Sequence, residues 1–188
     1  MAIADLFQIS VDELLSNEKS EKKQSDYIYE SRTEYDIDGK KNFDIKLGGA
    51  YAVDLKAYHG EKIEVAMFSN VYKNLLADYK VKIDDIKNRI DIDLNRFNEA
   101  SEADAKESLV INIFIPVKYI GKIELSVNAG TLNITDIDNE HIEVNGKISE
   151  VTLQGNKSEI EIDSNLDMQI SVLSHEGALE INQLSATS

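Results

Sequence analysis

The chain lacks cysteine and tryptophan, has one proline (Pro116), and holds arginine at only three positions. Without cysteine, a disulfide framework, a thiolate metal site and a cysteine nucleophile are excluded. Basic residues are also scarce, because 20 Lys and Arg stand against 35 Asp and Glu among 188 residues, which gives a formal net charge of −15. A surface this negative repels nucleic acid, so we expect no nucleic-acid partner.

Long apolar stretches are also missing. No segment approaches the roughly 20 apolar residues that a membrane-spanning helix needs, so we expect no membrane insertion. The first residues, MAIADLFQISVDELL, lack the basic start and the apolar run of a signal peptide. We therefore expect a cytoplasmic protein as the chain is written, and a cell-envelope protein if a leader was removed.

Residues 1–25 differ from the rest of the chain. Leu6, Phe7, Val11 and Leu14 follow the spacing of a short amphipathic helix, and residues 16–25 form an apolar-free linker. Such a helix either packs on its own domain or docks a partner, and we favour packing because most apolar helix stripes are buried locally. Those four residues are the candidate partner-docking residues.

The chain is rich in short segments that alternate apolar and polar residues, which is typical of half-buried β-strands. We predict one all-β domain over 26–188, with an antiparallel meander over 26–107 and a strand-repeat region over 108–188. In the repeat region, segments such as IELSV and SEIEIDSNL are separated by Gly, Asn, Asp or Ser. Evenly spaced short strands with such breaks indicate a strand-rich repeat fold.

The repeat segments GTLNITDI, SEIEIDSNL and GALEINQL share one frame. In that frame Leu132, Ile160 and Leu179 correspond, with unequal steps of 28 and 19 residues. Self-similarity at about twenty residues is typical of stacked β-coils, and a two-sheet β-sandwich is the rival architecture. Five asparagines stand at the breaks, where tolerance of positive φ is useful: Asn128, Asn139, Asn145, Asn156 and Asn165.

The segment VINIFIPVKYIGKIELSVNAGTLNITDI, Val110 to Ile137, resembles the core signature of the bacterial "putative adhesin" domains of unknown function. That signature is an apolar strand, a proline, a short basic stretch and alternating strands around a glycine. The likeness extends over roughly residues 43–184. It implies an all-β, right-handed β-helix-like strand-repeat fold without known catalysis, and it offers no catalytic residues.

Candidate chemistry in the sequence is limited to carboxylates. Each of the three histidines, His59, His141 and His175, lacks a second His or Cys at metal-ligand spacing. Asp36 with Asp38, and Asp91 with Asp93, alternate along strands, as do Asp136, Asp138 and Glu140. Stacked coils would align such groups into a ladder able to hold Ca²⁺. We favour a solvated strand face, because alternation already accounts for these residues, and we assign no catalytic, cofactor or metal residue.

Three functions stay open at this point. The first is a non-catalytic binding or scaffold module for a protein or glycan partner, and the second is an intracellular regulator that docks a partner through its N-terminal helix. The third is a polysaccharide-active enzyme, which the absence of arginine from the repeat region disfavours. An open β-coil end also needs covering, so we expect the N-terminal helix or a second subunit to cap it, and in the second case the protein is a homo-oligomer.

Overall fold

The computed structural model describes residues 27–98, 100–165 and 167–183. The N-terminal helix and linker predicted for residues 1–25, with Leu6, Phe7, Val11 and Leu14, lie outside the described residues. The all-β prediction is confirmed, because strands dominate and the helices are short. No helix in the described part of the chain is long and apolar enough to cross a membrane.

In chain order, the helices and strands are β1 (Tyr29–Asp36), β2 (Lys41–Tyr58), β3 (Lys62–Ser69), α3 (Leu75–Asp78), β4 (Tyr79–Ile86), β5 (Arg89–Arg96), α4 (Glu102–Ser108), β6 (Val110–Pro116), the 3₁₀ turn η1 (Val117–Tyr119), β7 (Ile120–Thr135), β8 (Asp138–Gln154), β9 (Asn156–Ser164), β10 (Gln169–Val172), β11 (His175–Glu176) and β12 (Leu179–Gln183).

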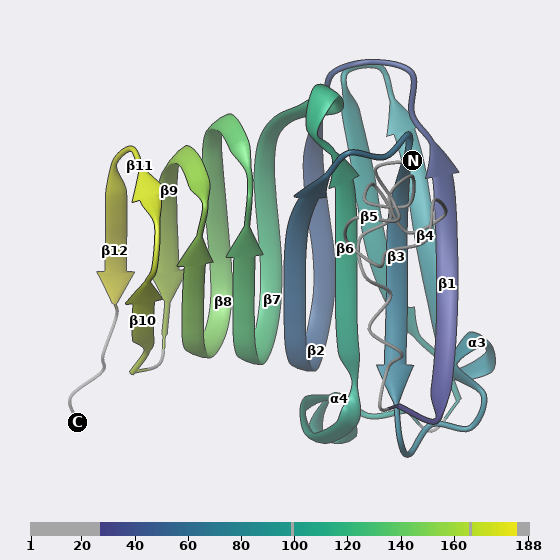
Figure 1. The fold of residues 1–188 in the computed structure, drawn as a ribbon. Coiled ribbons are helices and arrows are strands. Elements are labelled where there is room, and N and C mark those ends of the chain that lie inside the picture. Colours follow the sequence, from purple (N-terminus) through teal and green to yellow (C-terminus); the bar gives the residue numbers. More distant parts are fainter. Residues whose placement is uncertain (1–26, 99, 166, 184–188) are drawn as a thin grey trace, which may run out of the picture.

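The strands form one open, mixed, 12-stranded sheet that folds over on itself. Figure 1 shows β2, β7 and β8 bending at the bottom of the view, so that the two halves of each strand run in two facing layers. The first layer contains β4, β5, the first halves of β2, β7 and β8, then β9 and β12. The second layer contains β1, β3, β6, the second halves of β2, β7 and β8, and then β10.

From β7 onward the chain repeats every 18 or 19 residues. Ile123 pairs in parallel with Ile142, Ile142 with Ile160, and Ile160 with Leu179. In the second layer, Leu132 pairs with Val151, which pairs with Ile170. Because each coil places its residues directly beside those of the next, equivalent positions form straight rows across the strands, which we call ladders.

Inward-facing ladders make the core. The ladder of Ile45, Leu125, Val144 and Ile162 has each side chain fully buried, as has the ladder of Leu55, Ile134 and Leu153. Alternating sequence supplies these residues, because every second side chain of a strand faces the other layer. The two layers thus bury one continuous cluster of aliphatic side chains.

The bends depend on close backbone approach and on asparagine side chains. At Gly146, which has φ of +146°, a Cβ atom would lie 1.8 Å from the carbonyl oxygen of Val127, so a side chain is excluded there. Asn156 is buried at the next turn, where its Oδ1 accepts from the Ile137 N–H at 3.0 Å and its Nδ2 donates to the Ile134 carbonyl at 2.8 Å. These contacts join consecutive coils where the ladder bonds end.

The structure decides against the rival sandwich, and two details differ from the sequence predictions. The described strands form one continuous sheet, so the sandwich of two separate sheets is not observed. Within residues 26–107, the consecutive strands β2 and β3 are not neighbours, because β6 lies between them; this is not the pairing of a simple meander. Leu132 belongs to the second layer and aligns with Val151, so the frame that matched it to Ile160 was wrong.

The expectation that asparagines take positive φ at the breaks was also wrong. The non-glycine residues with positive φ in the described chain are Lys87, Asn98 and Asp136. Asn128 and Asn139 lie within strands, and their side chains bind the backbone of a neighbouring coil.

Truncating a central ladder position should destabilise the whole domain. We expect Leu125→Ala to lower the free energy of unfolding by about 2–5 kcal/mol, because the side chain is fully buried and its neighbours on adjacent coils are fixed. The matched control is Ile86→Ala, since Ile86 is 48% exposed on β4; it should cost less than about 1 kcal/mol. Urea unfolding followed by circular dichroism measures both, and equal losses would contradict the ladder core.

Candidate functional site

The outer surface of the first layer carries a ladder of carboxylates, which we call the acidic face. Strand pairing places Asp84 beside Asp91, Asp91 beside Asp44, and Asp44 beside Glu124. The ladder continues through the last three coils, and its full course is Asp84, Asp91, Asp44, Glu124, Glu143, Glu161 and Glu180. The parallel register, with β4 added antiparallel at one end, therefore lines up one acid from each of these strands.

At the β4–β5–β2 end, this ladder is neutralised within each strand. A cation two residues away pairs with each carboxylate: Lys82 with Asp84, Arg89 with Asp91, and Lys46 with Asp44 at 2.7 Å. The Arg89 guanidinium binds Asp91 through two parallel bonds, of 2.6 and 3.0 Å. Residues two apart on a strand share a face, so these pairs follow directly from the sequence.

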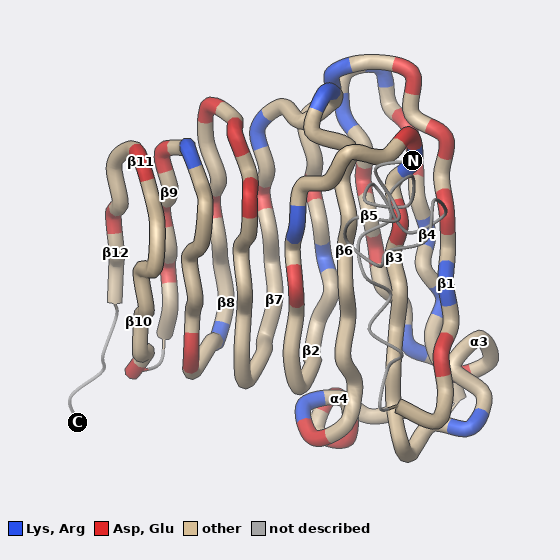
Figure 2. The backbone as a smooth tube through the Cα atoms, in the orientation of Figure 1, with Lys and Arg blue, Asp and Glu red and all other residues tan. Residues whose placement is uncertain are grey.

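The β7–β12 end of the ladder lacks this compensation. Within the described residues, Glu124, Glu143, Glu161 and Glu180 form no ion pair with Lys or Arg. The chain has no Lys or Arg after Lys157. Figure 2 shows red segments recurring along the coils up to β12, whereas blue segments are few on the β7–β9 coils and absent from β10 to β12. The acidic face is therefore neutral in one half and negative in the other.

The row of positions that carries Lys82 and Lys46 at one end carries short polar or acidic residues at the other. Lys122, two residues from Glu124, pairs with Glu140 instead, at 3.2 Å. Lys46 pairs in register with Ser126, which is followed on the next coils by Asn145, Asp163 and Asn182. Asn145 donates to Glu143 at 2.7 Å and Asn182 to Glu161 at 3.3 Å. The Oδ1 atom of Asp163 is shielded and accepts no hydrogen bond from the described residues. Acceptors outnumber donors in this half of the acidic face.

The outer surface of the second layer has a different character. Its ladder of Asp54, Asn133, Thr152 and Ser171 changes from an acid to neutral amides and hydroxyls. Asn133 donates to Asp54 at 2.6 Å, so the acid has a partner on the adjacent coil. The charge asymmetry between the two outer surfaces is therefore built into the register.

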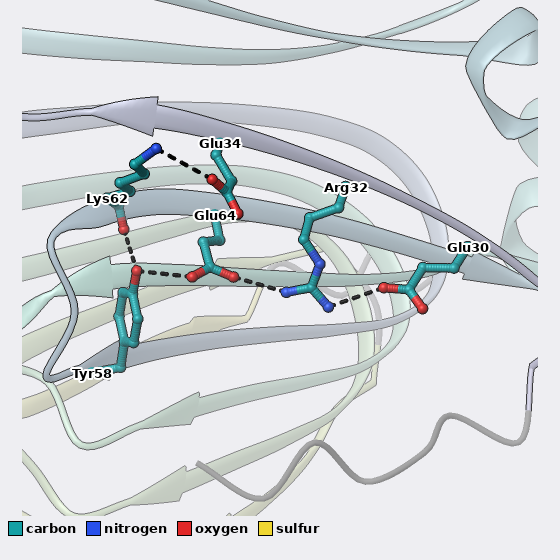
Figure 3. A network of polar contacts seen from close by, with 6 residues as sticks. All are labelled: Glu30, Arg32, Glu34, Tyr58, Lys62 and Glu64. Carbon is teal, nitrogen blue, oxygen red and sulfur yellow. Dashed lines mark hydrogen bonds and ion pairs between the residues drawn. The ribbon is translucent and has the colours of Figure 1, made fainter. Parts of the chain in front are cut away.

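A second polar cluster lies where β1, β2 and β3 meet, and Figure 3 shows its members. Arg32 donates to Glu64 at 2.8 Å and to Glu30 at 2.9 Å. The Tyr58 hydroxyl lies within hydrogen-bonding distance of the Lys62 carbonyl and, at 3.1 Å, of Glu64. Lys62 reaches Glu34 at 3.4 Å. Since cations and acids alternate and each has a partner, this cluster fastens β1 and the β2–β3 turn together.

The sequence-derived candidates are spread across the molecule. His59 lies in the β2–β3 turn, His141 pairs in register with Glu159, and the Nε2 of His175 lies 3.4 Å from the Ala178 carbonyl. In the described part of the chain, no group of three or more His, Asp or Glu is placed to hold a metal ion. Asp91 and Asp93 lie on the first layer, whereas Asp36 ends β1 and Asp136 and Asp138 flank a turn.

Sequence reading missed most of the acidic ladder, although a signal for it was present. The triplet aliphatic–acid–aliphatic occurs as IEL at Glu124, IEV at Glu143, IEI at Glu161 and LEI at Glu180. These acids are 19, 18 and 19 residues apart, which is the coil repeat. Aligning the chain on this triplet gives the observed register.

No protein-family profile and no curated protein matches the chain. Solved structures do resemble it. A putative cell adhesion protein from Clostridium sporogenes has 9% identity and a TM-score of 0.43, with 83% of this chain and 99% of that chain covered. Putative adhesins from Bacteroides fragilis (10%, TM-score 0.33, 84% and 98%) and Parabacteroides merdae (10%, TM-score 0.31, 83% and 96%) are also similar. These solved structures are named as putative adhesins or cell adhesion proteins, and the segment Val110–Ile137 of this chain resembles the putative adhesin family.

The Tyr58 cluster should make stability depend on alkaline pH. Burial, and then the adjacent Glu64 carboxylate, raise the pKa of Tyr58 to about 12 from its ordinary 10.0. The unfolded phenol ionises first, so the contribution of Tyr58 is complete below pH 10 and is lost as the pH rises toward 12. We expect Tyr58→Phe to lose less stability than wild type over that interval.

The measurement is the urea unfolding midpoint at several pH values between about 9 and 12. Tyr51→Phe is the matched control, because Tyr51 is exposed on the surface away from this cluster, and it should keep the wild-type pH dependence. Identical slopes for wild type and Tyr58→Phe would show that the Tyr58 phenol is not held in its protonated form.

Proposed function

We propose that this protein is a non-catalytic binding module that presents the uncompensated half of its acidic face to a positively charged protein partner. The observation that carries the proposal is the in-register row of Glu124, Glu143, Glu161 and Glu180 without ion-pair partners in the described residues. A lysine- or arginine-rich segment supplies the donors and the positive charge that this row lacks.

The row is unfavourable for the isolated fold, which supports a role in binding. Neighbouring strands lie about 4.8 Å apart, so adjacent carboxylates repel each other, and like charges directly opposite on a sheet are destabilising. The same chain shows how such repulsion is relieved, because Lys46 and Arg89 neutralise the acids beside them. Local conflicts of this kind are expected at functional surfaces.

The shape of this region favours a surface contact over catalysis. Its acids project from consecutive strands of one sheet, and the adjacent positions carry Ser126, Asn145 and Asn182, which are short polar side chains. A row of this kind offers several equivalent contacts to an extended or helical basic segment. It also steers a cationic partner from a distance, so association should be fast at low salt.

The test uses a deca-lysine peptide as the probe and the full chain as the binder. Replacing Glu124, Glu143 and Glu161 together by Gln should weaken binding about tenfold, because three adjacent charges leave the contact. Calorimetry at low and at physiological ionic strength measures the dissociation constants. Binding by wild type should weaken as salt rises, since the Debye length shrinks from about 30 Å at 0.01 M to about 8 Å at 0.15 M.

The control makes the same change of net charge elsewhere. Glu107 lies on α4, Glu150 on the outer surface of the second layer, and Glu176 on β11. Replacing these three by Gln should change the dissociation constant less than about twofold. If both triple variants weaken binding equally, the probe responds to net charge alone, and the acidic face is not a recognition surface.

Partner docking through the N-terminal residues Leu6, Phe7, Val11 and Leu14 stays a separate prediction. Changing Leu6 and Phe7 to Asp should abolish partner capture if that segment carries the interaction, and should leave deca-lysine binding unchanged. The two binding modes can therefore be told apart in one set of proteins.

A further inference from the structure

The last coil that the structure describes leaves the inward-facing ladders without a further neighbour among the described residues. Along the ladder of Ile45, Leu125, Val144, Ile162 and Ile181, the first four side chains are fully buried and Ile181 is 43% exposed. The ladder through Leu55, Ile134 and Leu153 likewise ends at Val172, which is 49% exposed, and Leu173 beside it is 68% exposed. Apolar side chains at core positions therefore meet solvent at this end of the described chain.

The backbone of the same coil offers two strand edges. Within residues 27–98, 100–165 and 167–183, β12 pairs only with β9 and β10 only with β8. The Ala178 carbonyl accepts from the Ile160 N–H, so Ala178 faces β9. Because backbone groups alternate in direction along a strand, those of Leu179 and Ile181 point to the open side. On β10, the Leu173 N–H donates to the Leu153 carbonyl, so Leu173 faces β8. The backbone groups of Ile170 and Val172 therefore point to the open side of β10.

This edge lacks the features that usually prevent edge pairing. β10 (QISV) has no charged residue, and β12 (LEINQ) has only Glu180. Neither strand contains lysine or proline, the residues that commonly prevent edge strands from pairing with another chain. The edge strand at the other end of the first layer, β4, carries Lys80 and Lys82. The two ends of the sheet therefore differ in how well they are protected.

We propose that this end, formed by β10, β12 and Leu173, is the interface with a second copy of the chain, related by a two-fold axis through Ile181. A partner must offer two strand edges at the spacing of the two layers, with apolar side chains between them. The same end of a second copy has that geometry by identity, and two-fold interfaces close without forming filaments.

The side chains of β12 suit this antiparallel pairing. With Ile181 opposite Ile181 of the second copy, their outward backbone groups exchange two hydrogen bonds, and Glu180 lies opposite Asn182 of the second copy. Each carboxylate therefore faces an amide donor, and the two Glu180 side chains are kept apart. The same axis brings the two β10 edges together and covers Val172 and Leu173.

A single-cysteine variant tests the axis directly, because the chain has no cysteine of its own. Residues opposite each other in a hydrogen-bonded antiparallel pair have Cα atoms about 5.5 Å apart, which is within disulfide range. We expect the full-length Ile181→Cys protein to form a covalent dimer under mild oxidation. Ile86→Cys, equally exposed on β4, should stay largely uncrosslinked.

The non-covalent test is sedimentation equilibrium of the wild-type chain and of Ile181→Lys. Wild type should show a monomer–dimer equilibrium, and Ile181→Lys should raise its dissociation constant at least about tenfold, because two buried cations would meet at the axis. Ile86→Lys should leave the equilibrium unchanged, and circular dichroism should show both variants folded. Salt should strengthen the dimer, since both ends carry Asp167 and Glu180, which form no ion pair within the described residues, whereas Glu176 pairs with Lys157 at 3.8 Å.

Three results would overturn the proposal. The first is a wild-type protein that stays monomeric at high concentration, which would show that something other than a second copy covers this end. If removal of residues 1–25 then increased the binding of a hydrophobic dye, that segment would be the cover. The second is assembly into open-ended chains that is abolished by Ile181→Lys and also by Ile86→Lys. It would indicate that β12 of one copy packs against β4 of the next, head to tail. Dimers that persist in Ile181→Lys without Ile181→Cys crosslinking would place the interface elsewhere. None of these results depends on binding of the deca-lysine probe.

Discussion

The parallel register between coils is the constraint on which the rest of this structure depends. Once Ile123 lies beside Ile142 and Ile160, each other residue of a coil has its neighbours fixed as well. Inside, the register stacks branched aliphatic side chains into a continuous core. Outside, it stacks the acids that lie between those aliphatics. A one-residue slip would exchange these two sets of side chains, so burial of the core also holds the surface pattern in place.

Charge is distributed along the sheet in two different ways by that register. Near β4, β5 and β2, cations stand two residues from the acids and bind them within the same strand. From β7 onward, the row that continues from Lys46 offers no cation to the neighbouring glutamates, since it holds Ser126, Asn145, Asp163 and Asn182. Both regions belong to one layer of the same sheet, and they differ in the side chains that stand beside the acids. That separation of fold from surface chemistry lets one sheet carry a neutral region and an acidic region side by side.

The two ends of the sheet are finished differently. At one end, β1 and β4 are antiparallel additions, and the Tyr58 cluster fastens β1 to the β2–β3 turn. At the other end, the coil pattern runs to Gln183 with aliphatic residues still at the inward positions. A repeat fold needs its terminal coil covered, because each coil is stabilised by its neighbours. The exposed aliphatic residues Leu173 and Ile181 occur together on the last coil that the structure describes.

Much of the fold was readable from the sequence, because strand alternation depends only on neighbouring residues. The all-β class and coils of about twenty residues followed from that pattern. The register did not, since Leu132 and Ile160 both stand in alternating segments and nothing local says which layer each belongs to. The asparagines were misread for the same reason, because Asn156 acts on the backbone of another coil rather than on its own turn.

For the acidic face too, the sequence determined some features and the tertiary structure decided others. The sequence by itself determined the composition, with its excess of acids, its lack of cysteine and the alternation that places acids on one side of each strand. Only the tertiary structure decided that Asp91, Asp44 and Glu124 are neighbours, although they are far apart along the chain. It also decided which acids find a cation and which do not. The physical reason is that alternation acts between adjacent residues, whereas a ladder forms only when whole coils stack in register.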